Sequence, residues 1–142
     1  MKKKVVLVTA CGNKKEEKPR PAGELYKSAR IRHLYRKSKE LGVPFFILSA
    51  GYGLVSGDEM ISPYNAVMSE ERCRELEGEI AERLKAYDVI VYYRGGARKD
   101  YLDCIKKVAE KLGKEFIVFG YGNMGDIGKL GEVLKSLGYA FR

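Results

Sequence analysis

Cysteine and histidine are too few and too scattered in this sequence for the common disulfide or zinc frameworks. The 142 residues include three cysteines, at positions 11, 73 and 104, and a single histidine, His33. The cysteines are odd in number, lie far apart and form no C-x-x-C pair. This pattern speaks against a disulfide framework and against a structural zinc site, and we expect no metal and no cofactor.

Long hydrophobic runs are also missing. No apolar stretch approaches the roughly 20 residues that a membrane-spanning helix needs. The basic start, Met-Lys-Lys-Lys, leads into a short strand-like run rather than a signal-peptide core. We therefore expect a cytoplasmic protein with no membrane partner.

Acidic residues are outnumbered by basic ones. The 27 Lys and Arg residues exceed the 19 Asp and Glu residues, for a net charge of +8. Such a surplus favours polyanionic partners, namely nucleic acid, nucleotides or phosphorylated metabolites. Lys- and Glu-rich surfaces are also typical of proteins from hot environments, so charge alone leaves both interpretations open.

Four short apolar runs predict four strands of a parallel sheet. They are VVLVTA (5–10), FFILSA (45–50), VIVYY (89–93) and FIVFG (116–120). None alternates apolar with polar residues, as expected for strands covered on both faces. Helical patterns follow the strands over residues 24–41, 69–85, 99–112 and 129–137, and three of them end in Leu-Gly.

Strand and helix in fourfold alternation predict a single α/β domain over residues 1–142. Right-handed crossovers turn such a series into a three-layer αβα Rossmann-like sandwich, here with a four-stranded parallel sheet. We expect the flavodoxin-like strand order 2-1-3-4. No internal repeat or low-complexity linker interrupts the chain.

The polar residues suited to chemistry gather after the strands. In an open parallel sheet, ligands bind beyond the carboxyl ends of the strands, near the point where strand order reverses. Four loops should open there, over residues 11–23, 51–63, 94–98 and 121–128. In or beside them lie Cys11, Asn13, Lys14, Lys15, Ser49, Tyr52, Asp58, Glu59, Tyr64, Asn65, Arg94, Arg98 and Asn123. We therefore predict one site at this edge.

The first of these loops, CGNKKEEKPRPAGE, combines a thiol with two lysines. Gly12 lets the backbone approach a ligand, and Lys14 and Lys15 supply positive charge for an anion. The spacing of a Walker-type nucleotide loop is absent. Cys11 is either a nucleophile activated by the lysines or a small residue that fills space at the strand end.

The second loop, SAGYGLVSGDEMISPYN, is the most distinctive stretch. Gly51 and Gly53 allow a tight path, and Ser49 offers a hydroxyl at the strand end. Asp58 and Glu59 bring two acids, of which at most one need be catalytic. The ring that follows, Tyr64, either stacks on a base or pins the loop to the core.

Two loops nearer the C-terminus carry weaker signals. GYGNMG (120–125) matches the dinucleotide fingerprint G-x-G-x-x-G but follows the last strand, so no later strand can bring an acid to a ribose. Its backbone amides could still wrap a phosphate or base. RGGAR (94–98) places two arginines on a flexible loop, suited to phosphate or carboxylate contacts or simply solvated.

Four motifs resemble those of an uncharacterised α/β family related to the YaaA-like, peroxide-stress proteins, and more distantly the core domain of archaeosine synthase, a tRNA-modifying enzyme. They are C-x-x-K-K (11–15), L-Y-x-S (25–28), S-A-x-Y-G-L (49–54) and I-x-P-Y-N (61–65), with a partial match near the C-terminus at Gly125, Ile127 and Gly128. The resemblance implies a Rossmann-like domain linked to nucleobase or nucleic-acid modification. Asn65 stands where many relatives should have an acid, which weakens a general-base role there. The archaeosine-type proteins continue the lysine motif differently, so their amino-acid transfer does not carry over.

Together these patterns predict a protein that handles a nucleobase or nucleotide in nucleic-acid modification or salvage. Its activity would be that of a nucleobase or nucleoside hydrolase or transferase at a glycosidic bond or a modified base. The predicted catalytic residues are Ser49, Asp58, Glu59 and Cys11. The predicted substrate-binding residues are Asn13, Lys14, Lys15, Tyr26, Gly51, Gly53, Tyr64, Asn65, Arg94 and Asn123.

Two other functions remain open at this stage. A non-catalytic, stress-related nucleic-acid-binding protein would use the basic first helix, through Lys27, Arg30, Arg32, Arg36, Lys37 and Lys39. A metabolite or phosphate sensor would bind tightly without turnover.

Overall fold

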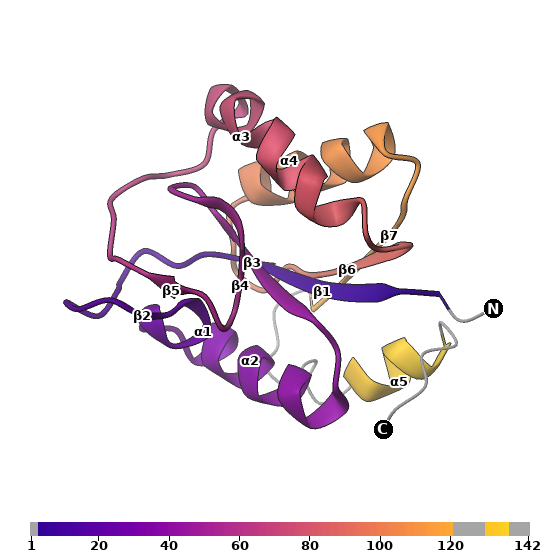
Figure 1. Cartoon of the computed structure of the whole chain (residues 1–142), viewed down its shortest axis with the longest axis horizontal. Helices are drawn as coiled ribbons and strands as arrows, with labels where there is room; N and C mark the ends of the chain where they lie inside the picture. The colour runs from indigo at the N-terminus through magenta and orange to yellow at the C-terminus, as the bar shows by residue number, and fades with distance from the viewer. Residues whose placement is uncertain (1–2, 121–129, 137–142) are drawn as a thin grey trace.

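The protein is built on one five-stranded sheet with helices on both sides (Figure 1). This computed structural model describes residues 3–120 and 130–136. Four strands run parallel: β1 (Val5–Ala10), β3 (Phe45–Ser49), β6 (Val89–Tyr93) and β7 (Glu115–Phe119). The sheet order is β4-β3-β1-β6-β7, so these four strands follow the predicted order 2-1-3-4.

A fifth strand corrects the prediction of a four-stranded, purely parallel sheet. β4 (Gly53–Ser56) pairs antiparallel with β3 and forms the edge of the sheet. Its four residues are too short to stand out as an apolar run, so the sequence predicted a loop there. Gly53 has a φ of +83°, a left-handed conformation that glycine adopts readily and that lets the chain reverse directly after β3.

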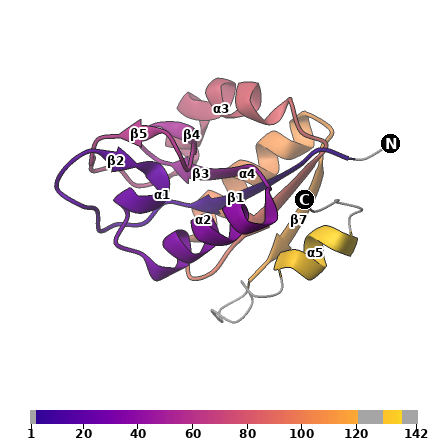
Figure 2. The same ribbon diagram turned by 60° about the horizontal axis from the view of Figure 1, so that its bottom comes forward.

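The helices divide between the two faces of the sheet. α3 (Glu70–Leu84) and α4 (Lys99–Lys111) cover one face, and α1 (Ala22–Leu25), α2 (Ala29–Leu41) and α5 (Leu130–Ser136) cover the other. Figure 2 brings the side with α2 and α5 toward the viewer. In the described part of the chain, no helix combines the length and apolar character of a membrane span.

Serine side chains cap the N-termini of α2 and α3, which lie on opposite sides of the sheet. Ser28 Oγ accepts a hydrogen bond from Ile31 N, and Ser69 Oγ accepts one from Arg72 N. These bonds satisfy amides that an α-helix leaves without partners in its first turn. At the other end of α2, Gly42 takes the left-handed conformation with φ of +68°, as the Leu-Gly ending predicts.

The helix predicted over residues 24–41 is in fact two helices. The chain leaves α1 at Tyr26 in an extended conformation and enters α2 only after Ser28. A β-bridge between Lys15 and Tyr26 draws this stretch out of helical geometry. Nearby, the short strands β2 (Arg20–Pro21) and β5 (Met60–Ile61) pair as a second small sheet.

A disulfide joins Cys73 of α3 to Cys104 of α4. The expectation of no disulfide framework is therefore wrong for this pair, whereas Cys11 is free and buried. The two bonded cysteines are 31 residues apart in sequence and belong to separate helices. Their pairing depends on which helices lie side by side, which cysteine spacing does not reveal.

The central strands form the core. All six residues of β1 are buried, as are the five residues of β3 and of β6. This confirms that these apolar runs are covered on both faces. The edge strand β7 is less enclosed, with its last four residues half-buried. The parallel strands all end at one edge, and the polar residues that follow them are assembled there.

Candidate functional site at the carboxyl ends of the strands

A connected set of hydroxyl groups lies beyond the end of β3. Ser49, the last residue of that strand, donates from Oγ to Tyr64 Oη at 2.7 Å. Tyr64 Oη in turn lies 2.7 Å from Tyr26 Oη. Tyr26 comes from the stretch between α1 and α2, and Tyr64 from the stretch before α3, so three separate segments meet at these hydroxyls. Three predicted site residues are thus brought together.

Ser49 also holds the turn that follows it. Its Oγ accepts hydrogen bonds from Gly51 N at 3.1 Å and Tyr52 N at 3.0 Å. From α3, Arg72 donates Nε to Ala50 O at 2.7 Å and Nη2 to Gly51 O at 3.1 Å. The hydroxyl of Ser49 is therefore occupied as donor and acceptor, which makes it a positioning group for this turn rather than an activated nucleophile.

Cys11 lies at the end of β1, beneath the same cluster. Its side chain is buried, and Sγ donates to Tyr101 Oη at 3.3 Å. That hydroxyl also accepts from Met68 N at 3.4 Å. A nucleophilic thiol is normally activated by a base or a nearby cation. The hydrogen-bond partner of Cys11 is a phenol, which is neither, whereas the guanidinium of Arg30 is close enough to interact electrostatically with the thiol. Burial of the side chain is what favours the space-filling role of Cys11 over the nucleophilic one.

A lysine covers the tyrosine pair. Lys15 Nζ lies 4.4 Å from the ring centroid of Tyr64 and 5.8 Å from that of Tyr26. It also donates to Asn13 O at 3.0 Å. Its neighbours Asn13 and Lys14 are exposed. The first loop therefore places positive charge over the tyrosine rings of this cluster; the predicted anion site at these lysines stays a prediction.

The tyrosine hydroxyls of this cluster are held in their neutral form. Burial is the main cause that raises the pKa of Tyr26, Tyr64 and Tyr101 above the ordinary tyrosine value, and the nearby thiol of Cys11 adds to it. At neutral pH these groups carry their protons and can donate hydrogen bonds. They are not general bases, so the cluster is equipped for recognition and for stabilising developing negative charge.

This burial predicts a specific alkaline transition. Tyrosines of the unfolded chain ionise near pH 10, whereas Tyr26, Tyr64, Tyr92 and Tyr101 have raised pKa values in the folded protein. Their stabilising contribution is complete below about pH 10 and is lost as the pH rises toward their folded-state values. In a titration at 295 nm, a group of late tyrosines should ionise together with the loss of far-ultraviolet circular dichroism. Ionisation of every tyrosine near pH 10 with intact dichroism would contradict the burial.

Arg30 is a largely enclosed cation at the point where strand order reverses between β1 and β6. Its Nη2 donates to Ala10 O at 2.8 Å, and Gly95 packs so closely that a Cβ there would lie 2.7 Å from Arg30 Cδ. Among the described residues, Arg30 Nε and Tyr92 Oη are buried polar atoms with no hydrogen-bond partner. Burial lowers the pKa of Arg30. The sequence counted this arginine among the cations of a basic helix, but the structure turns it inward to the sheet edge.

Asp58 and Glu59 lie away from the hydroxyl cluster. β4 runs antiparallel to β3, so it carries the chain from the Ser49 end of that strand back to its beginning. There, Gly57 N donates to the carbonyl of the first residue of β3 at 3.0 Å. The two acids follow at that opposite end. The predicted proton-transfer pairing of Ser49 with either acid is therefore not formed.

Both carboxylates have other partners. Asp58 accepts from Tyr35 Oη and lies 3.4 Å from Lys39 Nζ, and Glu59 lies 2.8 Å from Arg83 Nη2. The hydrogen bond from Tyr35, with the Lys39 ammonium, lowers the pKa of Asp58 and makes it a poor proton acceptor. Within residues 3–120 and 130–136, no group of three or more His, Cys, Asp and Glu side chains is arranged to hold a metal ion.

The remaining predicted residues are Gly51, Gly53, Asn65, Arg94 and Asn123. A Cβ on Gly51 would lie 2.6 Å from the ring of the neighbouring Tyr64, so glycine is required for the two to pack. Asn65 is exposed, and Arg94 is half-buried directly after β6. Asn123 and most of the GYGNMG motif lie outside the described residues.

Sequence reasoning missed Arg72 and Tyr101 as site residues. Both lie in the first turns of long helices, where they resemble ordinary amphipathic positions. Each reaches the site only because α3 and α4 pack beside the strand ends.

Comparison with known proteins places the chain in a family. No curated protein and no solved structure matches it. The family model DUF6884, described as a family of unknown function, matches residues 5–118. That span runs from β1 into β7 and includes the hydroxyl cluster, Lys15, Arg30 and Arg72. Because the match covers most of the 142 residues, the chain belongs to DUF6884, a family of unknown function.

Proposed function

We propose that the protein binds a nucleobase or nucleotide at the carboxyl edge of its sheet and acts in nucleic-acid modification or salvage. The observation that carries this proposal is the position of Lys15, 4.4 Å above the ring of a tyrosine whose hydroxyl is bonded to Ser49. A cation can bind the phosphate of a nucleotide, and an aromatic ring and neutral hydroxyls can bind its base; here all three lie within one small area. The motif resemblance to YaaA-like proteins, and more distantly to archaeosine synthase, supports the same substrate class.

The phosphate would lie against the first loop. Lys14 is exposed and Lys15 is half-buried on the tyrosine rings, so one cation faces solvent while the other faces the cluster. Arg30 adds a deeper cation with an unsatisfied Nε. The lysines at the surface and the more deeply placed Arg30 can both attract an anion, which suits a phosphate attached to a base.

The ring available for stacking is Tyr52. Tyr64 has Gly51 against its ring and Lys15 over it, so it has little free face for a base. Tyr52 is 39% exposed and meets Tyr64 edge-on, with centroids 5.2 Å apart. Within the proposal, Tyr52 stacks on the base and Tyr64 hydrogen-bonds to it.

The geometry supports recognition more directly than hydrolysis. Ser49 is occupied in its turn, the acids Asp58 and Glu59 lie at the other end of β3, and Cys11 is buried against a phenol. A transferase or hydrolase reaction at a glycosidic bond remains part of the proposal, with the neutral hydroxyls stabilising negative charge on the departing base. The helices on both faces of the sheet support a Rossmann-like three-layer arrangement, in which this edge is the usual ligand position.

Removing the stacking ring or the cation should weaken nucleotide binding. We expect Tyr52→Ala to lose roughly 1–3 kcal/mol of binding free energy, the value of one base-aromatic stack. Lys15→Ala should lose about tenfold in affinity for a nucleoside monophosphate and less for the free nucleoside, because the phosphate contact is lost. Calorimetric titration with the four ribonucleoside monophosphates and their nucleosides measures both effects.

The matched control is Lys106→Ala, an exposed lysine on α4, which should bind as the parent does. Mass spectrometry of the mixtures reports any base release or exchange. The proposal fails if none of these ligands binds, or if Tyr52→Ala and Lys15→Ala bind with the affinity of the parent.

A further inference from the structure

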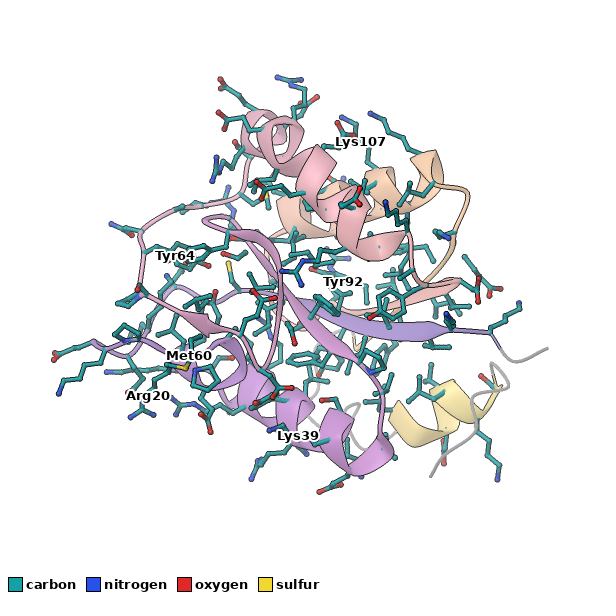
Figure 3. All side chains as sticks on the ribbon, viewed as in Figure 1. Arg20, Lys39, Met60, Tyr64, Tyr92 and Lys107 are labelled. Carbon is teal, nitrogen blue, oxygen red and sulfur yellow. A yellow bond between two sulfur atoms is a disulfide. The ribbon has the colours of Figure 1, made fainter. Side chains whose placement is uncertain are left out.

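A basic groove runs along α2 on the face of the molecule away from α3 and α4. It has a volume of about 870 Å³ and lies between the helix and the loop that precedes α1. Five basic side chains line it, against two acidic ones, Glu16 and Glu24. The basic residues are Arg20, Lys27, Arg32, Arg36 and Lys39. We call this feature the α2 groove. Figure 3 labels Arg20 and Lys39 at the side of the molecule where it lies.

Three of these cations are available to a ligand. Among the described residues, the side chains of Arg20, Lys27 and Arg36 form no hydrogen bond or ion pair, and all three are exposed. The other two are engaged. Arg32 bonds to Glu24 O at 3.1 Å, and Lys39 lies over the Tyr35 ring at 4.3 Å.

The α2 groove is more basic than the other clefts that the described residues form. A second cleft, beside β4, is lined by Glu59, Glu79 and Glu82 with a single arginine. A third, over the disulfide, is lined by Glu70, Asp100 and Asp103 with a single lysine. An anionic chain would meet mostly like charge in these two clefts and mostly opposite charge in the α2 groove.

The α2 groove is continuous with the candidate site. Residues 14–16 run antiparallel beside residues 25–27, joined by Lys27 N to Lys14 O at 2.8 Å and Glu16 N to Leu25 O at 2.7 Å. Successive side chains of such a strand point to opposite faces. Accordingly, Lys15 lies over the tyrosine rings while Glu16 and Lys27 line the groove. One short segment forms the shared wall of both.

We propose that the α2 groove binds the sugar-phosphate backbone of a single nucleic-acid strand, one nucleotide of which enters the site at Tyr52 and Lys15. This inference rests on the proposed function and specifies its substrate as a polymer rather than a free nucleotide. The 13 residues of α2 span about 20 Å, the length of roughly six stacked nucleotides. A single strand is the form whose bases are free to turn out of a stack and reach a pocket beside the backbone.

The test uses the full chain and a charge-matched pair of variants. Arg20→Gln/Lys27→Gln/Arg36→Gln removes the three available cations of the groove. Lys99→Gln/Lys106→Gln/Lys111→Gln removes the same charge from α4, on the other side of the sheet. Fluorescence anisotropy follows the binding of twelve-nucleotide oligothymidylate and oligouridylate, and of a twelve-base-pair duplex, over a series of salt concentrations. Calorimetry measures a nucleoside monophosphate in parallel.

We expect the groove variant to lose at least about tenfold in affinity for the single strands at low salt. Its slope of log affinity against log salt should fall by about two, since each phosphate contact on a single strand contributes roughly 0.7. The α4 variant should match the parent, and monophosphate binding should be unchanged in both. A larger effect for one oligomer identifies RNA or DNA as the preferred strand.

Other outcomes separate the two proposals. If the groove variant binds single strands with the affinity of the parent, or if both variants lose equal affinity, the proposed role of the α2 groove is wrong. Binding of a nucleoside monophosphate would in that case still support the proposed site at Tyr52 and Lys15. Stronger binding of the duplex than of either single strand overturns the single-strand assignment. Strand binding that depends on the groove, in a protein that binds no monophosphate or nucleoside, supports the groove and contradicts the proposed function.

Discussion

Replacing Cys73 and Cys104 together with alanine should lower the melting temperature by about 10 °C. The disulfide closes a segment of 31 residues, and a crosslink of that span stabilises a folded chain by roughly 3–4 kcal/mol through the unfolded state. In a domain of this size, each kcal/mol corresponds to roughly 2–4 °C. Thermal unfolding followed by circular dichroism, without reductant, measures the shift.

The third cysteine provides the control. Cys11→Ala removes a buried thiol but leaves the disulfide, so a reductant should destabilise it as it does the parent. The double variant should not respond to reductant at all. A double variant that melts within a degree or two of the parent would contradict a stabilising crosslink between α3 and α4.

The disulfide also matters for the site, because it joins the helices that support it. Arg72, next to Cys73, holds the carbonyls of Ala50 and Gly51, and Tyr101, one turn before Cys104, accepts from Cys11. We therefore expect the double variant to bind nucleotides more weakly than the parent even at temperatures where it remains folded.

Gly51→Ala should disrupt the hydroxyl cluster. The added methyl group would lie 2.6 Å from the ring of Tyr64, closer than carbon atoms can approach, so the ring must leave its position. Its hydrogen bonds to Ser49 and Tyr26 and its contact with Lys15 would be lost with it. Overpacking of this kind costs about 1–3 kcal/mol of stability, and binding at the site should fall by at least tenfold.

Gly78→Ala is the matched substitution. Gly78 lies within α3 and a Cβ there would meet no atom within 4 Å, so the same change should stabilise the protein by about 0.5–1 kcal/mol. Urea denaturation and nucleotide titration of the two variants separate packing at the site from the general effect of losing a glycine. A Gly51→Ala protein with parental stability and parental binding would show that Tyr64 has no role in either.

The candidate site was predictable in part, and the reason lies in how parallel sheets are built. Cys11 and Arg94 directly follow strands and Ser49 ends one, so recognising those strands was enough to place all three at one edge. Asp58 and Glu59 were assigned to the same edge only because β4 was taken for a loop. An antiparallel strand of four residues reverses the chain, and the side chains after it appear at the other end of the sheet.

The patterns within short stretches of sequence determined the four parallel strands, the helical segments of α3 and α4 and the glycine stops after α2 and α4. Those features follow from local periodicity and backbone preference, which act between residues near one another in the chain. Only the tertiary structure decided the disulfide between α3 and α4 and the inward orientation of Arg30. It also decided the β-bridge that divides the predicted first helix, and which cations along α2 are paired and which are available to a ligand. These features depend on which distant segments lie side by side. A disulfide, hydrogen bond or ion pair requires proximity in space, and it produces no periodic pattern in the sequence.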